Sequence, residues 1–421
     1  MKTKDRFTVD VRSEIGELEG VILHTPGLEI ENMTPENAER ALYSDILNLS
    51  VASKEHAQLN GVLKKLTKTF QVKDLLKDII SNEEIKTDLL HKICSNEDVF
   101  HIYDDLNNLN STELSKVLIE GLVIKNDSLT NYLSKERYSL RPLHNFFFTR
   151  DASVSWNERV LIGKMASQVR DRESIIMNAI FNHSTIINAE TINATNCKTC
   201  DSNTKIEGGD VLIGSEDILL IGTGARTTPQ GIDFVINHLK KQKETKHIIV
   251  QELPLSPESF IHLDMVFTFL DTDKCMVFEP VILQNNRLQT LHITVDNGKV
   301  SIKAVESIPE ILKTLGIDLK PIKCGGNNDD WIQEREQWHS GANFFAVGPG
   351  KLIGYSRNVH TLEELNNNGF EIIKAKHVIS GKVNVNNYSK YIITIEGSEL
   401  SRGGGGARCM TMPVRRKALN R

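Results

Sequence analysis

Short apolar runs that end in glycine recur along the chain, and a polar turn and a helix-like segment follow each of them. The clearest three contain the sequence Leu-Ile-Gly and occupy residues 160–163, 219–222 and 351–354. Segments with apolar residues at helical spacing follow at 168–177, 230–239 and 361–366. A short apolar run bounded by turn residues is typical of a buried strand, and a spacing of three and four is typical of a helix. The pattern therefore predicts repeated strand–turn–helix units and an α/β fold.

The spacing of these runs indicates an internal repeat. Their closing glycines are Gly163, Gly222 and Gly354, at intervals of 59 and 132 residues. The second interval is about two periods, and residues 274–279 lie within it as a fourth copy, while residues 20–27 would be a fifth. Recurrence of one supersecondary unit predicts a repeat or propeller-like architecture.

A long helix-like stretch separates the first copy from the second. Apolar residues recur at three and four positions within residues 72–80, 84–93 and 111–120. In the last of these segments Ser111 is the expected N-cap, with an apolar face behind it. We interpret residues 74–140 as a helical insertion into the repeat fold. A separate N-terminal domain is the alternative.

Composition narrows the class of protein. Hydrophobic residues make up 39% of the 421 residues and charged residues 25%, which is ordinary globular usage and excludes wholesale disorder. The net charge of −5 gives no basic surface for nucleic acid and no polybasic membrane arm. The apolar runs are of strand length and the N-terminal residues contain no apolar signal core, so we expect a cytoplasmic protein without a membrane segment.

Six cysteines are scattered along the chain, and in so long a sequence reduced thiols are expected. Cys409 differs from the others, because residues 403–406 are four consecutive glycines and Arg408 precedes it directly. Such a glycine run makes sense where the backbone bends closely around a ligand, and a neighbouring cation would lower the pKa of the thiol. Cys409 is therefore a candidate nucleophile. A buried structural cysteine in a flexible tail is the alternative.

His262 and Asp264 form a second candidate. They lie in the largely apolar segment 259–267, which we interpret as a strand. Side chains two residues apart in a strand point to the same face, so the imidazole and the carboxylate would lie together. A structural histidine is the alternative.

Carboxylates also follow two apolar segments. Asp151 closes the run 145–151 directly after Arg150, and Glu207 and Asp210 flank a pair of glycines. Loops at the ends of buried strands are common places for site residues. An Arg150–Asp151 surface pair and a simple turn are the respective alternatives.

Metal and cofactor motifs are absent from the sequence. Cys197 and Cys200 form a single CxxC in a polar stretch without a second pair, which favours a loop over a metal site. Residues 325–331 are acidic and rich in glycine but lack the spacing of an EF-hand. No HExxH, P-loop or dinucleotide fingerprint occurs. We expect neither a metal nor a cofactor.

Taken together, these segments resemble the arginine deiminases of the guanidino-group-modifying superfamily. The matching blocks span nearly the whole chain in order: 16–29, 145–151, 206–210, 262–264, 334–338, 353–358 and 408–413. The resemblance implies a five-module, pseudo-symmetric α/β propeller formed by residues 1–73 and 141–421, with residues 74–140 as a helical insertion.

The resemblance also implies roles for individual residues. Cys409 would be the nucleophile, and His262 would act first as general acid and then as general base. Glu207 would support the histidine and bind a substrate nitrogen. Asp151 and Asp264 would clamp the guanidinium group. The remaining substrate contacts would come from Asn145, Phe148, Arg170, Arg226 and Arg402.

The assignments of Arg170 and Arg402 each need a comment on position. Arg172 lies two residues beyond Arg170 and is an alternative for the same role. The family commonly carries an arginine five residues before the cysteine, where this chain has Gly404, so Arg402 is the candidate for binding the α-carboxylate.

The activity implied by the resemblance is hydrolysis of free L-arginine to L-citrulline and ammonia through a covalent thiouronium, without a metal, by a homo-oligomeric enzyme. Because Arg170 and Arg226 favour a substrate with a free α-carboxylate, agmatine is disfavoured. The alternatives are a related guanidino-modifying hydrolase, an amidinotransferase, and a non-catalytic arginine-binding protein.

Overall fold

The computed structural model describes residues 6–34, 45–197, 200–257, 260–327 and 329–419. Five of its sheets share one order of elements. In each, an antiparallel pair of strands is followed by a helix and then by a strand parallel to the second member of the pair. The fold is therefore a mixed α/β architecture built from a repeated unit.

The five units are distributed along the whole chain. They comprise β6 (Ser153–Trp156), β7 (Arg159–Ile162), α9 (Asp171–His183) and β9 (Glu190–Asn193); β10 (Val211–Ser215), β11 (Ile218–Thr223), α10 (Pro229–Leu239) and β12 (Lys246–Glu252); β13 (Phe267–Asp271), β14 (Lys274–Val277), α12 (Ile308–Thr314) and β17 (Lys320–Lys323); β18 (Phe345–Gly348), β19 (Lys351–Tyr355), α14 (Val359–Asn367) and β21 (Tyr391–Ile395); and β22 (Met412–Arg416), β2 (Leu18–Leu23), α3 (Leu49–Leu66) and β3 (Lys68–Gln71).

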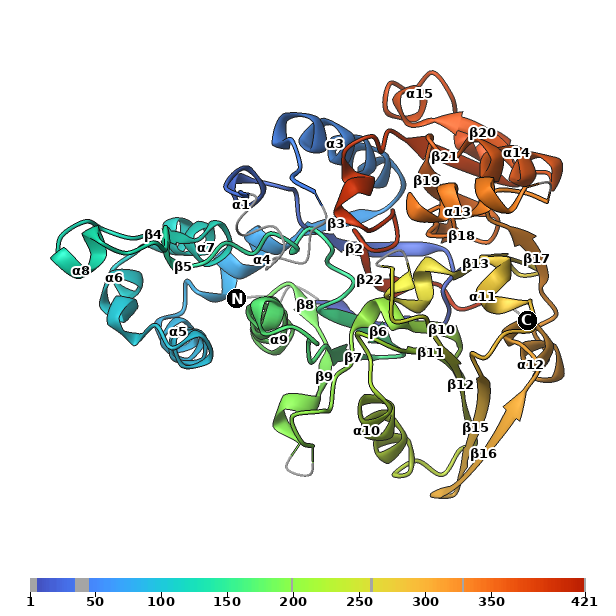
Figure 1. Ribbon diagram of the computed structural model, residues 1–421, viewed down its shortest axis with the longest axis horizontal. Helices are drawn as coiled ribbons and strands as arrows, with labels where there is room; N and C mark the ends of the chain where they lie inside the picture. Colours follow the sequence, from blue (N-terminus) through green and yellow to red (C-terminus); the bar gives the residue numbers. More distant parts are fainter. Residues whose placement is uncertain (1–5, 35–44, 198–199, 258–259, 328, 420–421) are drawn as a thin grey trace.

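The two ends of the chain meet in the last of these units. C-terminal β22 pairs with N-terminal β2, and Figure 1 shows the red and blue strands side by side. Two sheets carry additional strands: β15 (Thr290–Asp296) and β16 (Lys299–Val305) extend the sheet of β12, and β20 (Glu371–Lys374) pairs with β21.

The repeated apolar runs of the sequence are the middle strands of these sheets. They correspond to β7, β11 and β19, and the two weaker copies correspond to β14 and β2. Almost every residue of these strands is buried, because a middle strand has a neighbour on each side and is covered on both faces. The predicted strand positions of the five repeated runs are confirmed, and helices α9, α10 and α14 follow where the three clearest runs predicted them.

The segment between the first two units is largely helical. It contains α4 (Val72–Ile79), α5 (Glu83–Glu97), α6 (Tyr103–Asn107) and α7 (Ser111–Glu120), then β4 (Leu122–Val123), α8 (Leu129–Tyr132) and β5 (Tyr138–Leu140). Its buried residues share one hydrophobic cluster with α9, in which Leu90 and Leu118 belong with Met177 and Ile180. The helical segment is thus packed into the core of the neighbouring unit.

The predicted N-cap of α7 is wrong by one residue. Asn110, not Ser111, precedes the helix, and its side chain accepts hydrogen bonds from the backbone N–H groups of Thr112 and Glu113, both at 3.0 Å. Ser111 already has helical backbone geometry and therefore cannot cap.

The cysteines differ from the expectation at one pair. Cys197 and Cys200 form a disulfide, with Cα atoms 5.4 Å apart, within the range that a disulfide requires. Reduced thiols were therefore the wrong expectation for these two residues. Cys94, Cys275, Cys324 and Cys409 are free and buried. Among the helices of the described segments, none is long and apolar enough to cross a membrane.

Candidate active site

A small cavity collects most of the predicted site residues. Its volume is about 30 Å³, roughly the share of one water molecule in the liquid. It brings together Asn145, Phe148, Asp151, Arg170, Arg226, His262 and Cys409. Gly403, Gly404 and Gly405 form another part of its wall. Because a cavity of this size cannot hold an amino acid, the wall must move before a ligand of that size can enter.

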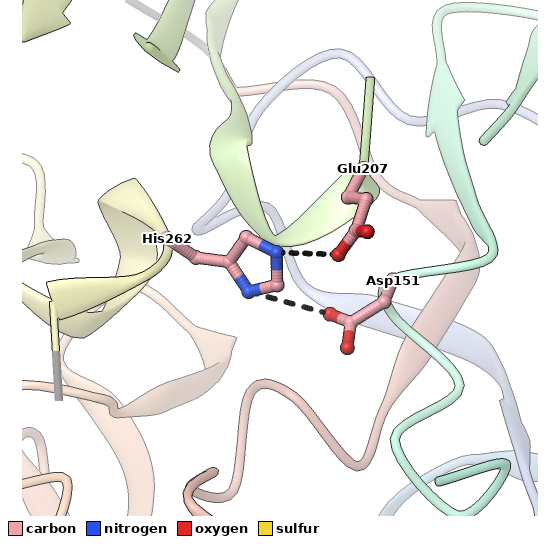
Figure 2. Close-up of side chains that lie close together, drawn as sticks. All are labelled: Asp151, Glu207 and His262. Carbon is pink, nitrogen blue, oxygen red and sulfur yellow. Dashed lines mark hydrogen bonds and ion pairs between the residues drawn. The ribbon is translucent and has the colours of Figure 1, made fainter. Parts of the chain in front are cut away.

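His262 lies between two carboxylates, as Figure 2 shows. Its Nε2 is 2.9 Å from Glu207 Oε2 and its Nδ1 is 3.7 Å from Asp151 Oδ1. Burial alone would lower the pKa of His262, but Asp151 and the hydrogen bond to Glu207 outweigh it and raise the pKa to about 9. Burial would likewise raise the pKa of Glu207, but His262 lowers it to about 2. The pair is therefore ionised at neutral pH.

The local backbone permits this close approach. A Cβ on Gly209 would lie 2.5 Å from His262 Nδ1, so any larger residue would displace the imidazole. Glu207 is held in turn, because its Oε1 accepts a hydrogen bond from the backbone N–H of Ala166 at 2.9 Å. Both oxygens of Glu207 thus have partners, which makes it a support for His262.

The predicted strand over 259–267 is wrong around His262. His262 has extended backbone geometry, but residues Leu263–Met265 form a short 3-10 helix, η6. The backbone N–H of Leu263 donates to Asp210 Oδ1 at 2.9 Å, and this contact turns the chain. Asp264 and His262 consequently do not share one face of a strand, and Asp264 lies against Cys409.

Cys409 lies against Asp264. Its Sγ is 3.7 Å from Asp264 Oδ2, and the same oxygen accepts from Arg408 Nη1 at 2.8 Å. Arg408 also pairs with Glu14, with Nη2 and Oε1 2.9 Å apart. The cation next to the thiol is therefore neutralised by two buried carboxylates.

This pairing corrects the expected effect of Arg408 on the thiol. Burial raises the pKa of Cys409 well above its ordinary value, Asp264 and Asp151 raise it further, and Arg408 opposes this rise without reversing it. Without substrate, Cys409 is a thiol at neutral pH.

Arg170 is bound to carboxylates. Its Nη1 is 2.8 Å from Asp151 Oδ2, and its Nη2 is 2.8 Å from Glu173 Oε2. The other oxygen of Asp151, Oδ1, is buried without a hydrogen-bond partner among the described residues. Arg172, the alternative to Arg170, lies away from this cavity and pairs with Glu97 at 3.2 Å. Arg170 is thus the arginine of this segment that reaches the site.

Arg402 lies outside the cavity. Its Nε is 3.0 Å from Asp45 Oδ2, and its Nη1 is 3.2 Å from Glu399 Oε2. The loop that follows it returns to the site through Gly404, whose φ of +82° favours glycine. Next to it, a Cβ on Gly405 would lie 2.5 Å from a ring carbon of Phe148.

Three residues that support the site were not among the predictions from the sequence. Glu14 and Glu173 hold Arg408 and Arg170, and Asn343 accepts from the backbone N–H groups of Arg408 and Cys409 at 2.9 and 3.4 Å. Glu173 follows Arg170 by three residues, the helical spacing at which side chains meet, so this pair could have been found in the sequence. Glu14 and Asn343 lie 394 and 65 positions from Arg408, and only folding reveals their contacts.

The cluster in Figure 2 also has the geometry of a cation site. One ligand atom each from Asp151, Glu207 and His262 lie within 4.8 Å of one another, all buried. A histidine coordinates a metal through a neutral nitrogen, and the pKa of His262 is about 9. A cation bound here would therefore have to displace the proton of His262.

Stability that depends on the His262–Glu207 pair will be lost as the pH rises. The pKa of His262 is raised from about 6.5 to about 9, so the folded chain keeps a proton that the unfolded chain releases between these values. The stabilisation is complete below about pH 6.5, amounts to roughly 3 kcal/mol, and disappears as the pH rises through 9. Urea unfolding across this range measures the fall in the free energy of unfolding.

A matched pair of variants assigns that fall to one residue. In His262→Gln it should be absent, whereas His183→Gln, at an exposed position at the end of α9, should retain it. An equal fall in both variants would contradict a protonated His262 in the folded protein.

Comparison with known proteins identifies the family. Residues 39–416 match the arginine deiminase family. The chain is 31% identical to the arginine deiminase of Clostridium perfringens, covering 99% of this chain and 100% of that protein, and 30% identical to the arginine deiminase of Staphylococcus aureus strain MRSA252, covering 98% and 99%. The chain belongs to the arginine deiminase family.

Solved structures agree on the fold. The amidinotransferase SxtG of Microseira wollei matches with a TM-score of 0.53 at 13% identity, covering 98% of both chains. The N-terminal domain of ArgZ, a cyanobacterial arginine dihydrolase solved with bound substrate, matches with a TM-score of 0.53 at 13% identity, covering 95% of this chain and 99% of the other. Both likenesses concern the mixed α/β fold.

Proposed function

We propose that this chain hydrolyses free L-arginine to L-citrulline and ammonia, with Cys409 as nucleophile and His262 as proton donor and acceptor. One observation carries the proposal: in a member of the arginine deiminase family, a buried thiol, a protonated imidazole and an Asp151 oxygen without a hydrogen bond among the described residues meet at one cavity. This combination suits a planar cation whose central carbon must be attacked.

Substrate binding supplies the positive charge that the Cys409 thiol needs nearby in order to ionise. The pKa of Cys409 is raised by burial and by Asp264 and Asp151. A guanidinium bound between these two carboxylates would pair with both and bring a positive charge beside Sγ, which favours the thiolate. The thiol proton leaves to solvent, and the bound cation thereby activates its own nucleophile.

The chemical steps follow from these protonation states. The thiolate adds to the guanidino carbon, and protonated His262 donates to the departing nitrogen, so that ammonia leaves and an S-alkylthiouronium remains. Neutral His262 then takes a proton from water, and the hydroxide adds to the same carbon. The C–S bond breaks as the carbonyl of citrulline forms, and the proton of the added hydroxyl leaves to solvent, where it protonates the released ammonia. Citrulline and the Cys409 thiolate are released. Glu207 keeps the imidazole oriented through both steps.

Selectivity for a free amino acid as substrate would depend on residues of the cavity that bind its α-carboxylate. Arg226, between β11 and α10, and Asn145 line the cavity and could bind the α-carboxylate. Arg170 already pairs with Asp151 and Glu173. It can bind the substrate α-carboxylate only if one of these two ion pairs breaks. Product analysis with arginine, agmatine and methylarginine tests the selection. Citrulline from arginine alone is expected, and equal turnover of agmatine would overturn a role for the carboxylate.

The same assay separates the alternatives. An amidinotransferase would pass the amidino group to an added amine acceptor such as glycine, with less ammonia released per arginine consumed. A binding protein would retain arginine and release no ammonia. Stoichiometric ammonia and citrulline in the presence of glycine are expected.

The arrangement of the five units as a propeller, and the bounds of the helical insertion, are part of the same proposal. The five repeated units are consistent with the five modules of a pseudo-symmetric propeller, formed by residues 1–73 and 141–421, with residues 74–140 as an insertion. A cytoplasmic location and a homo-oligomeric state stay predictions from the sequence.

Arg402 is proposed to bind the substrate carboxylate after the glycine loop moves. The cavity must enlarge to admit arginine, and residues 403–405 form one of its walls. Arg402→Ala should then raise the KM for arginine by roughly tenfold, the size of one charge-assisted contact, with little effect on agmatine. Initial rates of citrulline formation measure the change.

Arg415→Ala is the matched control, because Arg415 is similarly exposed and pairs with Glu19 on the surface. Its KM should equal that of the unmodified protein. Should Arg402→Ala also leave KM unchanged, Arg402 has no part in the site and its pairs with Asp45 and Glu399 are structural.

A further inference from the structure

A second, larger cavity lies between the helical segment and the body of the fold. Its volume is about 470 Å³, within the range of small-molecule sites. We call it the interface cavity and define it by Glu97, Tyr138, Arg141, Gln168 and Arg172, which are among the residues that line it. Figure 1 shows α5 and the β4–β5 pair on one side of this junction and α9 on the other.

Buried donors without partners face the interface cavity. Arg172 is 1% exposed, and its Nη1 has no hydrogen-bond partner among the residues the structure describes. Tyr138 is 8% exposed, and its hydroxyl is equally unpaired within the described ranges. Burial lowers the pKa of Arg172 and raises that of Tyr138. Buried polar groups are nearly always hydrogen-bonded, so two such groups beside a cavity indicate a ligand.

The chemistry of these groups selects an anion. A guanidinium only donates hydrogen bonds, and a phenol donates readily to a charged oxygen. Arg141, at the rim, is a second cation; it is half exposed and pairs with Glu136 at 3.3 Å. Glu97 is the acidic residue of the lining, and it already pairs with Arg172 Nε at 3.2 Å. An oxyanion that meets Nη1 would share Arg172 with Glu97 and accept from Tyr138.

The interface cavity and the catalytic cavity share two stretches of backbone. Gln168, Val169 and Arg172 line the interface cavity, while Arg170 between them binds Asp151 in the catalytic cavity. His144 and Asn145 are divided between the two cavities in the same way. A ligand that binds Arg172 would therefore also shift the turn that positions Arg170.

We propose that the interface cavity binds a small organic anion, with a carboxylate or phosphate group on Arg172 and Tyr138, and that this binding alters the affinity of the catalytic site for its substrate. The effect on substrate rests on the proposed function, whereas the binding itself does not. Because coupling between two sites is reciprocal, substrate must change the affinity for the anion by the same factor.

Calorimetry on the full chain without arginine tests the binding. The probes are citrate for carboxylates and ADP for phosphates, with sodium chloride at equal ionic strength as reference. At least one probe should bind with a Kd of about 1 mM or tighter. Arg172→Gln and Tyr138→Phe should each weaken it by roughly tenfold. Lys135→Gln removes an exposed charge three residues before Tyr138 that does not line the cavity, and should leave the Kd unchanged.

Each result decides the proposal. No binding beyond that of chloride, or binding unaffected by Tyr138→Phe, would overturn the site; that variant removes one oxygen and so remains informative if Arg172→Gln does not fold. Given binding, the KM for arginine should change at least twofold when the probe is saturating, and an unchanged KM would overturn the coupling. If the chain turns over no arginine at all, the proposed function fails while the binding result still stands.

Discussion

Replacing Cys409 with alanine will reduce citrulline production to below about one part in 10⁴ while arginine still binds. The thiol is the only nucleophile that the described residues bring to the catalytic cavity beside both His262 and Asp151. Without it the covalent intermediate cannot form, and a water molecule would have to attack a resonance-stabilised guanidinium directly. Citrulline assays measure the loss, and calorimetry with arginine measures the retained binding.

Cys275→Ala is the control for this variant. Cys275 is a free, fully buried cysteine on β14, within a different hydrophobic cluster from Cys409, so the substitution removes the same atoms without touching the cavity. It should cost stability and leave kcat unchanged. Citrulline production by Cys409→Ala above a trace would show that the covalent route assigned to this chain is wrong.

Asp151→Asn and Asp264→Asn will each lower kcat/KM by on the order of 100-fold or more. Asp151 Oδ1 is buried without a hydrogen bond among the described residues, 3.7 Å from His262 Nδ1, and Asp264 Oδ2 lies 3.7 Å from Cys409 Sγ. In the proposed mechanism both charges pair with the guanidinium and, by holding that cation at the thiol, favour the thiolate. An amide keeps the size of the side chain and removes the charge, so steady-state kinetics isolate the electrostatic part.

The two variants should differ in their side effects. Asp264→Asn weakens the partner of Arg408, whereas Asp151→Asn releases Arg170, which retains Glu173. Asp271→Asn serves as control, because Asp271 is buried on β13 and pairs with Lys390 away from the site. Loss of stability with intact kinetics in Asp151→Asn or Asp264→Asn would reduce that residue to a structural role.

Local patterns carried the prediction of the elements. The run 160–163 reads as a strand because a middle strand is apolar along its whole length, and its glycine marks the turn, as β7 confirms. The same reasoning failed at His262. Alternation gives a shared face only if the chain stays extended, and the hydrogen bond from Leu263 to Asp210 bends it into η6. That bond joins residues 53 positions apart, beyond any local rule.

The sequence by itself determined which residue types are available for chemistry. The glycine run before Cys409, the carboxylate after residues 145–150, and the repeated strand–helix pattern are properties of short stretches, in which backbone sterics and hydrophobic periodicity act. These local patterns were enough to indicate Cys409, His262, Glu207 and Asp151 as candidate site residues and to reveal the resemblance to a family.

Only the tertiary structure decided the protonation states of those residues. Arg408 adjoins Cys409 in the chain and was expected to lower the pKa of the thiol, but Glu14 and Asp264 neutralise it, and burial with the carboxylates raises that pKa instead. A pKa depends on every charge nearby and on the water excluded around the group. Those distances join residues hundreds of positions apart, so they exist only once the chain has folded.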